Sequence, residues 1–200
     1  MTRATDELAS DSKPTLGFLI KWIGIFIGLA IVALVGVGLV LPRQWEVEVE
    51  RTIEASPEAV HALVSDVEQW DRWMFDPAAE AAGMRVEASG QGVGATVSWS
   101  GGGSTGEMHL VESTLESGIR WDGKIETDEV NNHGSITYAV ADGQVTVTLR
   151  DTGELPPVLG GFFVPVMNSG LRQHFEGALG RLEATAEGEV EGDAAPAAPE

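Results

Sequence analysis

Residues 53–73 read IEASPEAVHALVSDVEQWDRW, and this stretch decides the fold class. Ser56 followed by Pro57 predicts a helix start, because the hydroxyl can cap exposed backbone N–H groups and proline fits the first turn. Apolar residues then recur at helical spacing from Val60 to Val64. Residues 65–68 have the spacing of a capping box, which predicts a second short helix ending in two tryptophans. The carboxylates of this stretch are therefore interpreted as helix caps.

Alternating apolar and polar residues lie on both sides of this stretch. Residues 45–53 place Val47, Val49 and Ile53 on one side, which predicts a strand with one buried face. From residue 84 onwards, short alternating runs separated by glycine predict an antiparallel sheet. The predicted strands cover residues 84–88, 95–100, 107–113, 118–125, 135–141 and 144–151. Turns are predicted at residues 101–104, 131–134 and 142–143.

A long helix is predicted after the last strand. Its apolar stripe consists of Met167, Leu171, Phe175, Ala178 and Leu182. Pro165 is expected in its first turn or at a kink after a start near Leu159. Residues 187–200 are too polar and too rich in proline to bury a core, so they are predicted to form a disordered acidic tail.

The order of one strand, two short helices, six strands and one long helix is similar to the helix-grip fold of the START-like SRPBCC superfamily. Within it the chain resembles the polyketide cyclase/dehydrase branch. The blocks that carry the resemblance are residues 53–60, 63–73, 92–99, 146–149 and 174–182. The resemblance implies an α+β domain over residues 44–186, in which a curved antiparallel sheet wraps around the C-terminal helix. A fold of this kind does not by itself specify a reaction.

The resemblance also implies a deep, mostly apolar cavity between the sheet and the long helix. Members of the superfamily use it to hold lipids, sterols, polyketides or other hydrophobic molecules. The side chains expected to line it here are Trp73, Met74, Trp99, Trp121, Tyr138, Phe162, Phe163, Met167 and Leu171. The alternative is that these side chains simply fill the core and leave no cavity.

An uncharged apolar run from Trp22 to Leu41 follows a short N-terminal segment, residues 1–20. Its length matches a hydrocarbon layer of roughly 30 Å, which predicts a transmembrane helix over residues 21–42. A signal peptide would have a shorter apolar region and an Ala-x-Ala cleavage pattern, which residues 38–43 lack. Some members of the resembled branch also carry an N-terminal membrane anchor.

The flanks of this run predict its orientation and a possible contact. Basic residues are slightly more frequent before it than close after it, which favours a cytoplasmic N-terminus and an extracytoplasmic domain. Gly24 and Gly28 could support weak dimerisation in the membrane, although such pairs are common in membrane helices.

Composition excludes several partners and sites. The formal net charge of −19 would repel nucleic acids and anionic headgroups alike. The chain has no cysteine, so it has no disulfide, thiolate nucleophile or cysteine-based zinc site. The glycines of residues 90–94 lack the spacing of a dinucleotide-binding loop, and no Gly-x-Ser-x-Gly elbow occurs. No cofactor is predicted.

No catalytic or metal-binding group is predicted either. His109 lies in a predicted strand and could face the cavity beside Glu107, but no third group is placed to orient the pair. The histidines at 61, 109, 133 and 174 do not have the His-x-x-x-His spacing of a metal site.

Three functions stay open at this point. The favoured one is membrane-anchored binding of a small hydrophobic ligand, lipid-like or polyketide-like, in the cavity. The second is an enzyme of the cyclase, dehydratase or hydrolase kind, which needs polar groups that converge inside the cavity. The third is a protein-interaction module at the membrane, which a collapsed cavity beside a large exposed apolar patch would favour.

Overall fold

The computed structural model describes residues 16–101, 104–126, 130–141 and 144–193, with side chains described for residues 17–188. Two predicted turns therefore include residues outside the described ranges, 102–103 and 142–143. The elements are α1 (Leu16–Val40), β1 (Gln44–Ile53), α2 (Pro57–Ser65), the 3₁₀ helix η1 (Val67–Arg72), α3 (Pro77–Ala81), β2 (Arg85–Ser89), β3 (Thr96–Gly101), β4 (Ser104–Thr114), β5 (Gly118–Ile125), β6 (Val130–Ala141), β7 (Gln144–Glu154) and α4 (Gly160–Asp193).

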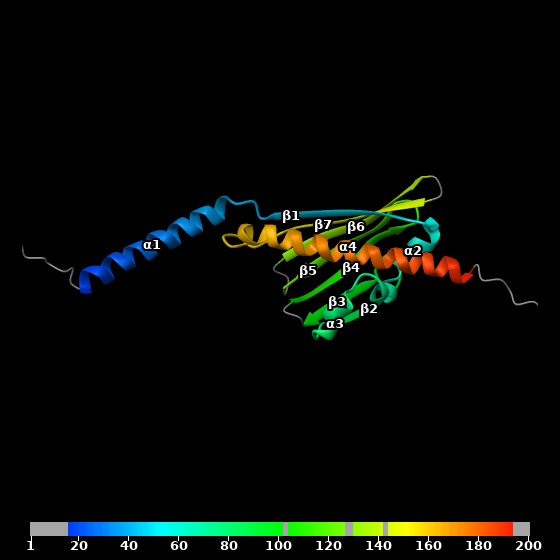
Figure 1. Ribbon diagram of the computed structural model, residues 1–200, viewed down its shortest axis with the longest axis horizontal. Coiled ribbons are helices and arrows are strands. Elements are labelled where there is room, and N and C mark those ends of the chain that lie inside the picture. The colour runs from blue at the N-terminus through cyan, green and yellow to red at the C-terminus, as the bar shows by residue number, and fades with distance from the viewer. Residues whose placement is uncertain (1–15, 102–103, 127–129, 142–143, 194–200) are drawn as a thin grey trace, which may run out of the picture.

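The strands form one antiparallel sheet in the order β1-β7-β6-β5-β4-β3-β2. The first strand pairs with the last, with Val49 opposite Leu149, so residues far apart in the chain lie side by side. A register shift near Leu110 in β4 adds to the curvature. The long helix α4 lies across the curved sheet, as Figure 1 shows. The predicted α+β helix-grip fold is confirmed.

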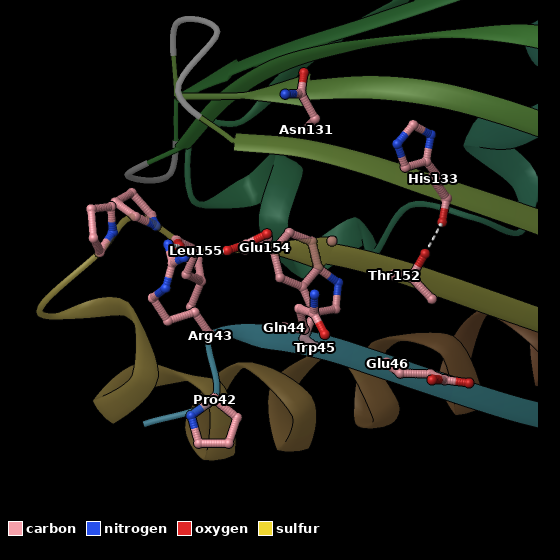
Figure 2. Close-up of a pocket in the computed structure, with 13 residues that line it drawn as sticks. Pro42, Arg43, Gln44, Trp45, Glu46, Asn131, His133, Thr152, Glu154 and Leu155 are labelled. Atoms are coloured by element: carbon pink, nitrogen blue, oxygen red, sulfur yellow. Dashed lines mark hydrogen bonds and ion pairs between the residues drawn. The ribbon is translucent and has the colours of Figure 1, made fainter. Parts of the chain in front are cut away.

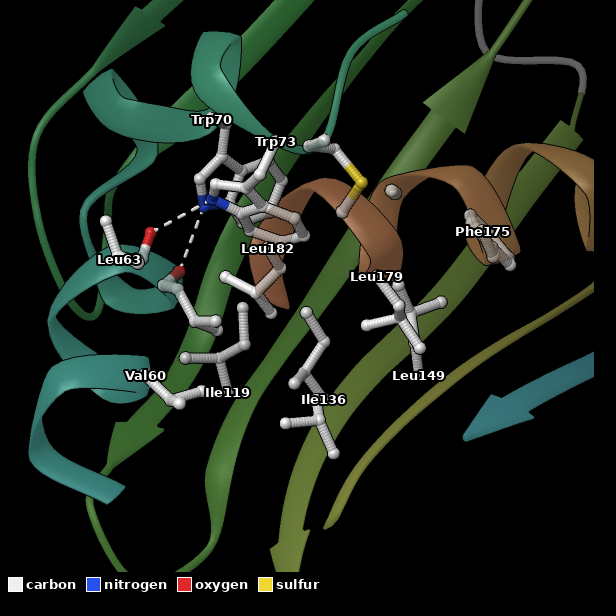
Figure 3. Packing of buried hydrophobic residues seen from close by; sticks show 14 of the residues in the cluster. Val60, Leu63, Trp70, Trp73, Ile119, Ile136, Leu149, Phe175, Leu179 and Leu182 are labelled. Carbon is white, nitrogen blue, oxygen red and sulfur yellow. Dashed lines mark hydrogen bonds between the residues drawn. The ribbon is translucent and has the colours of Figure 1, made fainter. Parts of the chain in front are cut away.

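The hydrophobic core fills the space between the sheet and the C-terminal half of α4 (Figure 3). Trp70 and Trp73 are fully buried there, with their ring centroids 5.5 Å apart. The indole N–H of Trp70 donates to the carbonyl of Val64 at 3.0 Å, and that of Trp73 donates to the carbonyl of Leu63 at 3.3 Å. The stretch that decides the fold class therefore anchors its own two tryptophans in the core.

The predicted turn at residues 131–134 is wrong, because these residues lie in β6. Asn132 faces the inside of the sheet and donates a hydrogen bond to Asp151 on β7. Gly134 makes room for the ring of Trp121 on β5, since a side chain there would overlap that ring. Pairing with two neighbouring strands overrides the local preference of asparagine and glycine for turns.

The predicted capping box at residues 65–68 is also wrong. Ser65 is the buried last residue of α2, and Asp66 caps η1 by accepting a hydrogen bond from the N–H of Glu68 at 3.1 Å. The carboxylate of Glu68 instead accepts from the N–H of Gly90 at 3.1 Å. In a capping box the carboxylate of Glu68 would accept from the backbone N–H of Ser65, but here it bonds to the loop after β2. At the start of α2, Ser56 accepts from the N–H of Ala59 at 3.2 Å, as predicted.

Helix α4 continues through Asp193, beyond the predicted start of the tail at residue 187. Ala186 is still buried, and the carboxylate of Glu187 accepts from the N–H of Glu54 at 3.1 Å. The three glutamates of residues 187–193 favour the helix, whereas Gly188 and Gly192 oppose it. Residues 194–200 of the predicted tail lie outside the described residues.

Helix α1 starts at Leu16, five residues before the predicted boundary, because apolar residues continue on the N-terminal side of Lys21. Within the part of the chain that the structure describes, residues 17–40 form one helix long and apolar enough to cross a membrane. A Cβ added at Gly24 or Gly28 would meet nothing within 4 Å, and dimerisation through these glycines stays a prediction. Residues 1–15 lie outside the described residues.

Candidate functional site

A mostly apolar cavity of about 190 Å³ lies between the sheet and the N-terminal half of α4. It adjoins the core but is separate from its centre. Its lining residues are Met74, Phe75, Met84, Trp99, Met108, Trp121, Ile125, Asn132, Asp151, Met167, Leu171, His174 and Phe175. Strands β3 to β7 supply one wall, α4 supplies the facing wall, and the segment after η1 supplies one side.

Five of the nine residues predicted to line a cavity lie together here: Met74, Trp99, Trp121, Met167 and Leu171. The other four lie elsewhere. Trp73 is in the core, and Tyr138 lies at the far end of β6, with its hydroxyl 3.2 Å from Nδ1 of His61. Phe162 and Phe163 are exposed at the start of α4.

Glycines in the sheet leave room for the cavity. Inward-facing positions of four neighbouring strands are occupied by Gly106, Gly123, Gly134 and Gly153. A Cβ at Gly134 would overlap the ring of Trp121, and a Cβ at Gly153 would overlap the ring of Trp45. The rings therefore lie against neighbouring strands instead of reaching across to α4. The same face bears large aliphatic residues at the core end, such as Ile136 and Leu149.

Four of the residues that line the cavity are methionines. Met74, Met84, Met108 and Met167 all line the cavity, and the only other methionine in the sequence is Met1. Methionine is unbranched and polarisable, so it adapts its shape to different apolar surfaces. Met84 and Met108 were not among the predicted lining residues. Alternation along β4 was the available signal, because it places Met108 on the same face as the buried Leu110.

A buried polar group forms part of one wall. Asp151 is 4% exposed and accepts hydrogen bonds from the indole N–H of Trp45 and from the amide of Asn132, each at 2.9 Å. Burial raises the pKa of Asp151 above its ordinary value of 3.8, although the two hydrogen bonds oppose this change. Oδ1 of Asn132 is buried and has no hydrogen-bond partner within the described residues. This polar group was also missed, because residues 131–134 were interpreted as a turn.

His174 is the polar residue of the facing wall. Burial, followed by the positive charge of Arg181, lowers the pKa of His174 below its ordinary value of 6.5. The ring is therefore neutral near pH 7. His109, which was considered as a residue that could face the cavity, is exposed on the other face of β4, because it alternates with the inward-facing Met108. The described residues contain no group of three or more side chains arranged to hold a metal ion.

A larger groove of about 780 Å³ lies where β1 and β7 meet the end of α1 (Figure 2). Polar and charged residues dominate its lining. Arg43 donates to the carbonyl of Leu155 and pairs with Glu154, and Thr152 donates to the carbonyl of His133 at 3.2 Å. Several of these polar groups already bond to one another. The groove therefore lacks the mostly apolar lining that small-molecule sites usually have.

Comparison with known proteins identifies the family. The sequence profile of the family described as "Polyketide cyclase / dehydrase and lipid transport" matches residues 44–187. The chain belongs to this family. The match spans β1 to α4 and includes every residue that lines the cavity. A search of the curated proteins found no match.

Solved structures share the fold of this polyketide cyclase/dehydrase-family domain. TTHA0849 from Thermus thermophilus is 21% identical, with a TM-score of 0.56 over 72% of this chain and 98% of that one. CV1439 from Chromobacterium violaceum is 16% identical, with a TM-score of 0.54 over 73% and 99%. DynU16, described as a putative protein in the dynemicin biosynthetic locus, is 16% identical, with a TM-score of 0.51 over 71% and 47%. At these identities the likeness extends to the fold alone.

The buried carboxyl group leads to a prediction about pH. Because the pKa of Asp151 is raised in the folded state, its stabilising contribution is complete below 3.8 and is lost as pH rises through the folded pKa. The stability of the wild type relative to Asp151→Asn should therefore fall across that range. Thermal unfolding of both proteins over a pH series measures this difference in stability. The general effect of the acidic surface cancels in the difference, and a difference independent of pH would contradict the prediction.

Proposed function

We propose that the chain binds a small apolar ligand in the cavity under α4 while α1 anchors it in a membrane. The observation that carries this proposal is the cavity lining, in which methionine and aromatic side chains outnumber the three polar ones, Asn132, Asp151 and His174. Apolar pockets with a few placed polar groups are the usual form of a small-molecule site. Membership of a family whose description includes lipid transport supports the same class of ligand.

The volume limits what the cavity can accept. About 190 Å³ is below the range of roughly 300–1,000 Å³ for drug-sized ligands. The cavity therefore suits a compact ring, a short acyl chain or the end of a longer lipid. The four methionines can change rotamer and enlarge it. A polar ligand group with a donor would find its acceptors on the side of Asp151 and Asn132.

Contacts at the end of α1 support an anchor over a removable signal sequence. The carbonyl of Val158 lies where a side chain at Gly38 would be, and Leu41 lies against Gly161 in the first turn of α4. The chain then enters β1 after Arg43. The end of α1 is thus packed against the domain, where a cleaved signal peptide would need an accessible cleavage site. We retain a cytoplasmic N-terminus and an extracytoplasmic domain as part of the proposal.

The hydrogen bonds of Asp151 favour a structural role for its carboxylate over a catalytic one. An enzyme of the cyclase or dehydratase kind needs an acid or base that reaches the substrate. Both carboxylate oxygens of Asp151 already accept hydrogen bonds, Oδ1 from Trp45 and Oδ2 from Asn132. The carboxylate therefore joins β1, β6 and β7 at the cavity wall, which is a structural role.

Filling the cavity tests the proposal. Leu171→Trp should lower the affinity for a compact apolar fluorescent probe such as naphthalene by about tenfold or more, because a larger side chain occupies the binding volume. The measurement is a probe titration of the full chain in detergent. Leu115→Trp, at a site 40% exposed and outside the cavity lining, is the matched control and should leave the affinity unchanged.

Native mass spectrometry of the full chain in nanodiscs complements this titration. A retained apolar molecule that Leu171→Trp excludes and Leu115→Trp keeps would identify the ligand class. A folded wild type that retains nothing and binds no probe would contradict the proposal. So would a Leu171→Trp variant that binds the probe as the wild type does.

A further inference from the structure

An exposed apolar patch lies at the start of α4. We call it the α4 tip and define it as Leu159, Phe162, Phe163 and Val166, which are 54%, 37%, 59% and 71% exposed. No charged residue occurs between Glu154 and Arg172, although the chain as a whole carries a net charge of −19. Clustered exposed apolar side chains in a charge-free segment indicate a contact surface.

The α4 tip lies beside the end of α1. A Cβ at Gly38 would meet the carbonyl of Val158 and would lie 3.1 Å from the ring of Phe162. Figure 1 shows α4 beginning next to the point where α1 ends. The apolar surface of α1 therefore directly adjoins the α4 tip. A helix that crosses the bilayer brings whatever adjoins its end to the headgroup level.

The same helix joins the α4 tip to the cavity. Met167 directly follows Val166 and lines the cavity, and Leu171 lies one turn further along. Phe162, Phe163 and Val166 are exposed, whereas Phe175 and Ala178 further along are buried against the sheet. The first turns of α4 thus present apolar residues both outward and towards the cavity, as expected for a segment at an apolar boundary.

We infer that the α4 tip inserts into the lipid interface beside α1, so that the cavity takes its ligand from the bilayer. The inference rests on the proposed function for the span of α1 and for the ligand class. Continuity with α1 selects lipid as the occupant of the patch, ahead of a second copy or another protein. An apolar molecule then passes from acyl chains to Met167 along an apolar surface, without entering bulk water.

Single labels test where the α4 tip lies. The chain has no cysteine, so Phe163→Cys and Val140→Cys each introduce one labelling site in the full chain. The native side chains are equally exposed, at 59%, and Val140 lies near the end of β6 that is distant from α1 (Figure 1). Each variant receives a nitroxide label and is reconstituted into phosphatidylcholine nanodiscs. Collision of the label with oxygen, which concentrates in lipid, and with a water-soluble nickel chelate is then measured.

The α4-tip label should collide mainly with oxygen, and the Val140 label mainly with the nickel chelate. Equal exposure of both labels to the chelate overturns the inference. Shielding of the Phe163 label from both reagents also overturns it, because protein instead of lipid would then cover the patch. Probe binding by the same labelled chains in detergent distinguishes failure of the inference from failure of the proposed function. If the chains bind the probe but the α4-tip label is exposed to water, only the insertion of the α4 tip is rejected. If neither variant binds the probe, the proposed function is rejected.

Discussion

Replacing Trp70 with alanine should lower the free energy of unfolding of the domain by about 3–5 kcal/mol. Its ring is fully buried, lies edge-on to Trp73 and Trp121, and donates its N–H to the carbonyl of Val64. Truncation leaves a cavity in the centre of the core and a buried carbonyl without its donor. Urea unfolding of the full chain in detergent, followed by circular dichroism, measures the change.

Trp99→Ala is the matched control for this prediction. Trp99 is half-buried and lines the cavity, so its loss should cost less stability and act mainly on probe binding. A Trp70→Ala variant within about 0.5 kcal/mol of the wild type would contradict the assignment of the core, because surface substitutions usually cause changes of that size.

Gly134→Ala should destabilise the domain by about 1–3 kcal/mol, the usual cost of overpacking. The new methyl group would overlap the ring of Trp121, which must then move off β6 towards α4. Because Trp121 also lines the cavity, probe affinity should fall together with stability. Chemical unfolding and probe titration on the same samples measure both effects.

Gly170→Ala should have the opposite effect on the stability of the domain. Gly170 lies in α4 with nothing within 4 Å of a Cβ at this position, so alanine should stabilise the helix by roughly 0.5–1 kcal/mol. A Gly134→Ala variant with wild-type stability and wild-type probe affinity would contradict the claim that the glycines of the sheet keep the cavity open.

The periodic elements could be predicted from the sequence. The predicted strand at 118–125 coincides with β5, and the stripe from Phe175 to Leu182 packs against the sheet as expected. Local patterns suffice in these cases because alternation and helical spacing specify which side of an element is apolar. The charge-free run before Leu41 likewise predicted one long apolar helix.

The lining of the candidate site could be predicted only in part. Trp73 and Trp121 are both buried in the core, yet only Trp121 also lines the cavity. The family resemblance assigned Phe162 and Phe163 to the cavity lining, but they lie on the exposed first turn of α4. Alternation identifies an inward-facing residue but not the residue opposite it.

The sequence by itself therefore determined the fold class, the apolar helix α1 and the inward faces of most strands. Only the tertiary structure decided which half of the concave face is core and which is cavity. That division depends on register, which sets Gly134 beside Trp121 and Gly153 beside Trp45. The pair Trp45–Gly153 joins the first strand to the last, and the pair Trp121–Gly134 depends on the length of the β5–β6 connection. Alternation within one strand specifies which face is buried but neither of these pairings.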